Sequence, residues 1–126
     1  MNSDTLHREG LSLFQQLHGG HAGEAIVADM ARLCPAFADM TVDWAFGGVM
    51  ARPGLDLMTR QFVVIASCVT LGHAQPQLRA HVEAALGLGA TRQQIVEAIL
   101  QLVFYAGGAA VRNALVSVRD LLEEPQ

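Results

Sequence analysis

The chain has 126 residues, enough for one domain with a single hydrophobic core. Its formal net charge is −4 and it shows no basic stripe, which argues against a nucleic-acid-binding function. The longest apolar run, Phe62 to Leu71, is far shorter than the roughly 20 residues of a membrane span. Because only 16% of the residues are charged and 52% are hydrophobic, we expect other subunits to cover part of an apolar surface.

Neither the start of the chain nor its cysteines indicate export. Met1-Asn2-Ser3-Asp4 is not a basic region and no long apolar stretch follows it, so we expect no signal peptide. Cys34 and Cys68 stand far apart in the sequence. Since disulfides are rare in proteins of the cytoplasm, we expect a cytoplasmic protein with two reduced thiols.

Glycine and proline divide the chain into helical stretches, and no segment alternates apolar and polar residues as a strand does. Ser3 is a candidate cap for a first helix over residues 3–17, which Gly19-Gly20 would end. A second helix is expected over residues 24–33. Pro35 suits the first turn of a third helix, with apolar positions at Phe37, Met40, Trp44 and Ala45.

A turn over residues 52–55, Arg-Pro-Gly-Leu, precedes the fourth helix. That helix is expected to begin at Asp56 or Thr59, and it is apolar on all sides over residues 62–71. An apolar helix of this kind is typical of the centre of a domain or of an assembly.

Three more helices complete the expected fold. Pro76 begins a fifth helix that ends at Gly87, and Thr91 with Gln94 forms a capping-box pair for a sixth. A final helix is expected over residues 109–122. The apolar faces of the fifth and sixth helices are Leu78, Val82, Ala85 and Leu86, and Ile95, Ile99, Leu102 and Val103. The sequence therefore predicts one all-α domain of six or seven helices.

His81 is the one plausible acid–base group in the apolar fifth helix. A histidine can change protonation near neutral pH, which makes it the usual general acid or base. The alternative is a core histidine whose ring is hydrogen-bonded to a backbone carbonyl group.

A row of polar residues, Glu97, Gln101 and Tyr105, repeats every four positions in the sixth helix. That spacing predicts that they stack along one helix face. They would either line a wet cavity or form a stripe facing solvent.

Three arginines, Arg52, Arg60 and Arg79, flank these helices. A guanidinium group binds a carboxylate through two hydrogen bonds, so any of them could hold an acidic ligand. Each could equally form an ion pair at a surface or interface.

No metal or cofactor is expected. His18 and His21 stand on either side of a helix stop, and no cluster of cysteines or carboxylates completes a metal site. Cys68 lies in an apolar helix, where burial raises the pKa of a thiol and makes it less reactive.

Several short motifs have an order and spacing that resembles the carboxymuconolactone decarboxylase family. They are Arg52-Pro53-Gly54-Leu55-Asp56, Thr59-Arg60, Leu78-Arg79-x-His81, Ala85-Leu86, Gly89-x-Thr91, Ile95-x-Glu97 and Gln101-x-x-x-Tyr105-x-Gly107. The resemblance covers about residues 36–115. It implies an alkylhydroperoxidase D-like all-α fold and a homohexamer arranged as a trimer of dimers.

The family has a redox branch that carries Cys-x-x-Cys-x-x-x-His, in which a thiol pair works beside the histidine. Counted back from His81, those cysteines would fall at Ala74 and Gln77, so this chain lacks them. The resemblance therefore implies the other branch, whose members decarboxylate 4-carboxymuconolactone without a cofactor.

Three positions depart from the family pattern. A Trp-Gly-Glu sequence is Phe46-Gly47-Gly48 here, and a proline after Tyr-x-Gly-x is Ala109. A glutamate of the redox branch that follows Thr-Arg is Gln61. The departures leave the fold assignment unchanged and bear on the substrate.

The resemblance implies a lyase that removes CO2 from 4-carboxymuconolactone or a related unsaturated acid. His81 would be the general acid and Glu97 a second catalytic residue, and the expected substrate-binding residues are Arg60, Arg52, Trp44, Tyr105 and Gln61. One alternative is a peroxidase of the redox branch, which the missing thiol pair disfavours. Another is a repurposed paralogue that binds a small acid, favoured by Gly48 and Gln61.

Overall fold

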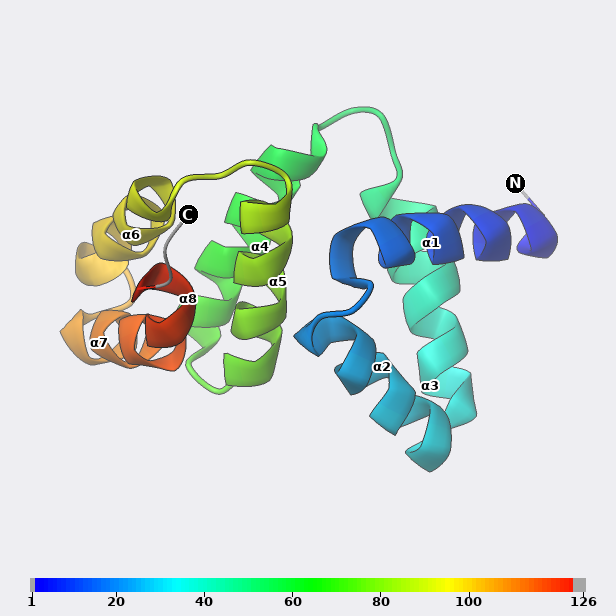
Figure 1. The fold of residues 1–126 in the computed structure, drawn as a ribbon, viewed down its shortest axis with the longest axis horizontal. Helices are drawn as coiled ribbons and strands as arrows, with labels where there is room; N and C mark the ends of the chain where they lie inside the picture. Colours follow the sequence, from blue (N-terminus) through cyan, green and yellow to red (C-terminus); the bar gives the residue numbers. More distant parts are fainter. Residues whose placement is uncertain (1, 124–126) are drawn as a thin grey trace. The chain divides into compact units, whose positions relative to one another are not determined.

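The computed structural model describes residues 2–123, and within them all regular structure is helical (Figure 1). The predicted all-α class is confirmed. The chain divides into two compact units, residues 1–57 and 58–126. The expectation of a single domain over residues 1–126 stays a prediction. No helix in the described residues has both the length and the apolarity needed to cross a membrane.

The first unit is made of four successive helical segments: α1 (Ser3–His18), α2 (Ala22–Leu33), α3 (Pro35–Met40) and η1 (Thr41–Met50). The segment η1 is π-helical and continues α3 directly. The cap of α1 is Asn2 and not Ser3, because the Asn2 side chain accepts a hydrogen bond of 2.8 Å from the backbone N–H of Thr5. Both residue types cap helices, and only the extended backbone of Asn2 shows which one lies outside the helix.

Two glycines let the backbones of α1 and η1 meet. A Cβ atom at Gly10 would lie 1.9 Å from the carbonyl oxygen of Val42, and one at Gly47 would lie 2.3 Å from that of Leu6. Such contacts are open only to a residue without a side chain. The buried apolar residues of this unit are Leu13, Phe14, Leu17, Ala38, Val42 and Phe46.

His18 is enclosed by aromatic rings in this first unit and is only 2% exposed. Its ring centroid lies 5.7 Å from that of Phe14 and 5.4 Å from that of Phe46. Gly23 is so near that a Cβ atom there would lie 2.5 Å from Nδ1 of His18. Burial, and to a smaller extent the charge of His21, lowers the pKa of His18 to about 4. The ring is therefore neutral at pH 7.

The second unit consists of α4 (Leu57–Leu71), α5 (Gln75–Gly87), α6 (Arg92–Leu100), the 3₁₀ segment η2 (Gln101–Phe104), α7 (Gly108–Ser117) and α8 (Arg119–Glu123). Helices α4 and α5 lie side by side, and α7 contacts both α5 and α6 (Figure 1). The capping box of Thr91 and Gln94 is confirmed at the start of α6. The core of this unit is formed by Ile65, Cys68, Val69, Ala74, Leu78, Val82, Ala85, Ala90, Ile95, Ile99, Val111, Ala114 and Val118.

Two helix predictions in the second unit are wrong. The sixth helix tightens into a 3₁₀ turn after Leu100, which places Tyr105 beyond its end. The final helix is not continuous over residues 109–122, because α7 ends at Ser117 and α8 begins at Arg119. At this break the carbonyl oxygen of Ser117 accepts a hydrogen bond from the Arg79 side chain, so a side chain takes an acceptor at the helix end.

Helix α4 is not enclosed on all sides in the single chain. Ile65 and Val69 are fully buried, whereas Val63 is 58% and Leu71 57% exposed. The expectation was the centre of the domain or of an assembly, and the single chain does not cover this outer face of α4. Its place in an assembly stays a prediction.

Candidate active site

The pair formed by His81 and Gln61 is the most informative polar contact in the second unit. Nδ1 of His81 lies 2.7 Å from Oε1 of Gln61. An amide oxygen only accepts hydrogen bonds. Nδ1 of His81 therefore carries a proton and is the donor of the hydrogen bond to Gln61. In the neutral ring Nε2 is then left without a proton, and it is the nitrogen that can take one up or, when protonated, release it.

The packing of α4 on α5 explains why these two residues meet. Gln61 precedes the buried Ile65 by four positions, and His81 lies between the buried Leu78 and Ala85 at spacings of three and four. Residues at these spacings share a helix face. The apolar faces that join the two helices therefore also bring Gln61 and His81 together.

Gln61 has a second polar end inside the protein. The residue is fully buried, and its Nε2 has no hydrogen-bond partner among the described residues. An unpaired buried donor costs about 1–3 kcal/mol. The Nε2–H group is such an unpaired buried donor, and Gln61 lines none of the grooves formed by Glu97, Trp44 or Arg52.

The predicted polar row of the sixth helix is only partly formed. Glu97 and Gln101 line an open hollow of about 410 Å³, with Phe62, Gln94 and Ala98. Tyr105 does not line it and is 84% exposed. The expected stacking of all three residues is wrong, because the 3₁₀ turn after Leu100 rotates later side chains away from an α-helical register. His81 and Gln61 do not line this hollow either.

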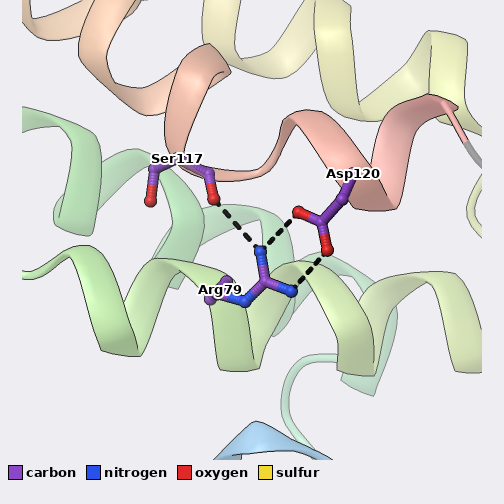
Figure 2. A network of polar contacts seen from close by, with 3 residues as sticks. All are labelled: Arg79, Ser117 and Asp120. Atoms are coloured by element: carbon purple, nitrogen blue, oxygen red, sulfur yellow. Dashed lines mark hydrogen bonds and ion pairs between the residues drawn. The ribbon is translucent and has the colours of Figure 1, made fainter.

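Arg79 is held by residues of the same unit. Its Nη1 and Nη2 donate to the two carboxylate oxygens of Asp120, each at 2.7 Å, and Nη1 also donates to the carbonyl oxygen of Ser117 at 3.2 Å (Figure 2). The bond to Arg79 holds the pKa of Asp120 at about 2. Of the three arginines considered as ligand anchors, Arg79 therefore has a structural role. Arg60 is half-buried on α4, next to Gln61 in the chain.

Two predicted substrate-binding residues belong to the first unit and lie in different grooves. Trp44 is 63% exposed and lies on η1 in an apolar groove with Phe37, Met40, Thr41, Ala45 and Val49. Arg52 lies in a groove of about 610 Å³ that Arg8, Glu9 and Asp56 also line. These two residues therefore do not share one pocket within their unit.

The thiols and histidines give no sign of redox or metal chemistry in the described chain. Cys34 is exposed and Cys68 is buried, and neither forms a disulfide. Burial raises the pKa of the Cys68 thiol. Within residues 2–123 no group of three or more His, Cys, Asp and Glu side chains could hold a metal ion.

Sequence reasoning identified His81 and Gln61 separately but did not pair them. A usable signal was present, since Gln61 stands four residues before Ile65 on the buried face of an apolar helix. A buried amide needs a polar partner. The buried, aromatic setting of His18 was also missed.

Comparison with known proteins identifies the family. The sequence matches the carboxymuconolactone decarboxylase family over residues 35–120. The chain therefore belongs to this family, and the resemblance seen in its motifs is confirmed.

Three relatives are similar over most of the chain. An uncharacterized 15.0 kDa protein from the nqo9–nqo10 intergenic region of Paracoccus denitrificans is 38% identical over 97 residues, which is 75% of this chain and 72% of the relative. The 4-carboxymuconolactone decarboxylase of Acinetobacter baylyi is 27% identical over 98% of this chain and 92% of its own length. The nitrosuccinic acid decarboxylase npaB of Metarhizium robertsii is 25% identical over 97% of this chain and 87% of its own. The family and the latter two relatives support a decarboxylase-like role.

Proposed function

We propose that this protein is a cofactor-free carboxy-lyase acting on 4-carboxymuconolactone or a related acid, with His81 as the general acid. The observation that carries the proposal is the hydrogen bond from His81 Nδ1 to the buried Gln61, in a chain with two relatives that are decarboxylases. It fixes Nδ1 of the imidazole as a hydrogen-bond donor, and we propose Nε2 as the nitrogen that transfers the proton.

The chemistry requires a substrate that stabilises the electron pair left behind when CO2 departs. When the bond to the carboxylate carbon breaks, its electron pair stays on the remaining carbon skeleton. The unsaturated lactone of 4-carboxymuconolactone delocalises that pair, and the nitro group of nitrosuccinic acid does the same. We therefore propose as substrate class an acid whose leaving carboxylate is attached to carbon next to, or conjugated with, such a group.

The protein must then bind the acid and deliver a proton to carbon. Protonated His81 gives its Nε2 proton to the carbanion, while Nδ1–H stays bonded to Gln61. Arg60, half-buried on α4, serves as the carboxylate clamp, whereas substrate binding by the fully buried Gln61 stays a prediction. The catalytic role of Glu97, and substrate contacts by Arg52, Trp44 and Tyr105, stay predictions.

Steady-state kinetics with His81→Ala and Arg60→Ala tests this assignment. His81→Ala should lower kcat by about 10²-fold to 10⁴-fold, the usual worth of a general acid. Arg60→Ala should raise KM more than it lowers kcat, if the clamp holds ground state and transition state alike. The measurement is CO2 release from 4-carboxymuconolactone and from nitrosuccinic acid. Arg119→Ala, a change of an exposed arginine in the same unit, is the matched control. Wild-type kcat in His81→Ala would contradict the proposal.

One alternative has an observation of its own in favour. Gly48 stands where we expect the decarboxylases to carry a glutamate, so the chain could bind a small acid without turning it over. A Cβ atom at Gly48 would meet its nearest atoms at 3.6 and 3.9 Å, which is ordinary van der Waals contact. Binding in calorimetry without CO2 release, with turnover gained in Gly48→Glu but not in Gly48→Gln, would favour this alternative.

We also propose that the active protein is a homohexamer of the cytoplasm, as the family resemblance implies. Apolar side chains that the single chain leaves open support assembly: Phe37 is 57%, Trp44 63% and Phe104 90% exposed. Phe37 and Trp44 line one apolar groove with Met40 and Val49, and a contiguous exposed apolar surface of this kind is typical of an interaction site.

A further inference from the structure

We propose that Gln61 is a positioning residue that keeps a proton on Nδ1 of His81 in both charge states, so that Nε2 is the nitrogen that exchanges protons with the substrate. The catalytic consequence rests on the proposed function. The positioning itself rests on the contact between the two side chains.

The geometry leaves the Gln61 amide little freedom. The side chain is fully buried on α4, and its Oε1 lies 2.7 Å from Nδ1 of His81 on α5. This is a short hydrogen bond for an N–H donor and an oxygen acceptor. Helix packing therefore fixes the amide, and the amide fixes the imidazole ring.

The charge states of histidine decide which end of the amide must face the ring. A histidine that acts as a general acid is first doubly protonated, and then both ring nitrogens are donors. Only Oε1 of Gln61 can accept from Nδ1–H in that state, since Nε2 of the amide is itself a donor. After Nε2 of His81 has given up its proton, the same hydrogen bond remains. The neutral ring is thus left with its proton on Nδ1.

An amide does this without holding the charged ring. A carboxylate at residue 61 would also accept from Nδ1–H, but it would attract the imidazolium as an ion pair and oppose release of its proton. Gln61 orients the ring while remaining neutral. Gln61 therefore determines which nitrogen of His81 transfers the proton, and other groups determine how strong an acid His81 is.

Nuclear magnetic resonance can read the tautomer directly. In protein labelled with ¹⁵N-histidine, long-range ¹⁵N–¹H correlations distinguish a protonated Nδ1 from a protonated Nε2. The chain has five histidines, so His81→Gln assigns the signals of His81. At high pH the neutral His81 should carry its proton on Nδ1, although a free imidazole side chain in water prefers Nε2–H.

Variants of Gln61 test the cause. Gln61→Met has a similar length and no acceptor, so the His81 signals should shift toward the Nε2–H form. Gln61→Glu keeps an acceptor and should keep the Nδ1–H form. Gln93→Met, at an exposed glutamine of α6, should change nothing. Circular dichroism verifies that each variant is folded, and the wild-type spectrum alone decides the matter if Gln61→Met is not.

The outcomes separate this inference from the proposed function. A neutral wild-type His81 protonated on Nε2, or a Gln61→Met variant that keeps the Nδ1–H form, overturns the inference whatever the activity. The expected tautomers together with full kcat in His81→Ala would uphold the positioning and overturn only the decarboxylase role. If both proposals hold, Gln61→Met should also lower kcat by about 10-fold to 100-fold, the range found when a partner that orients a metal-bound histidine is lost.

Discussion

The buried His18 should make the first unit sensitive to mild acid. In the folded protein burial holds the pKa of His18 at about 4, below the ordinary value of 6.5. Between these two pH values the unfolded chain binds a proton that the folded chain does not. The free energy of unfolding is therefore undiminished by His18 above pH 6.5 and falls as the pH decreases toward 4.

The size of the effect follows from the pKa. One pKa unit corresponds to about 1.4 kcal/mol, so a fall from 6.5 to about 4 corresponds to about 3–4 kcal/mol of unfolding free energy. The His18 ring has little room to move to a position in which its protonated form would be hydrated. It is 2% exposed and lies between Phe14, Phe46 and Gly23. Below pH 4 the loss should level off, because both states then bind the proton.

Urea unfolding followed by circular dichroism at several pH values from 7.5 to 4 measures this loss. His18→Phe keeps an aromatic ring but cannot bind a proton, so most of the loss between pH 6.5 and 4 should disappear. His18→Leu serves the same purpose if the larger ring is too tight against Gly23. His73→Gln, at an exposed histidine, is the control and should keep the wild-type pH dependence. Equal pH dependence of stability in wild type and both His18 variants would show that His18 does not cause the loss. Hydrogen exchange over residues 10–18 would show whether the first unit is the part that opens.

Two further predictions concern the glycines of η1 and the assembly. Gly47→Ala should lower the free energy of unfolding by about 1–3 kcal/mol, because its methyl group would meet the carbonyl oxygen of Leu6. Gly48→Ala should instead raise the free energy of unfolding by up to about 1 kcal/mol, since its methyl group has room and glycine is unfavourable in a helix. Equal urea midpoints for the two variants would contradict the close crossing of α1 and η1. Light scattering at micromolar concentration should give several times the chain mass of 13.5 kDa. A monomer of 13.5 kDa at that concentration would rule out the proposed hexamer.

Helix starts could be predicted from sequence where a residue pattern has one common use. The capping box at Thr91 and Gln94 and the proline at the start of α3 are such patterns, and both are confirmed. The choice between Asn2 and Ser3 could not be made in this way, because each can cap a helix.

Features that depend on contacts between distant residues were not predictable. The break between α7 and α8 coincides with the hydrogen bond from Arg79 to the carbonyl group of Ser117, which lies 38 residues away in the chain. Tyr105 does not lie in the expected row, because the helix tightens into a 3₁₀ turn before it. Sequence periodicity cannot show this, since it assumes a constant rotation per residue. His81 was selected by its residue type, whereas its pairing with Gln61 required the packing of α4 on α5.

The bonds of Arg79 connect the end of the chain with the residue proposed to transfer the proton. Arg79 and His81 are two positions apart on α5, so their side chains leave the helix on nearly opposite sides, roughly 160° apart. One side chain is bound to Asp120 and Ser117 and the other to Gln61, and together these bonds resist rotation of α5 about its axis. Shortening the chain before α8 would remove Asp120 with its two hydrogen bonds to Arg79 and so weaken the restraint on this side of α5, while the bond to Ser117 remains. C-terminal truncation would then change the orientation of Nε2 of His81, although every residue proposed to touch the substrate is still present.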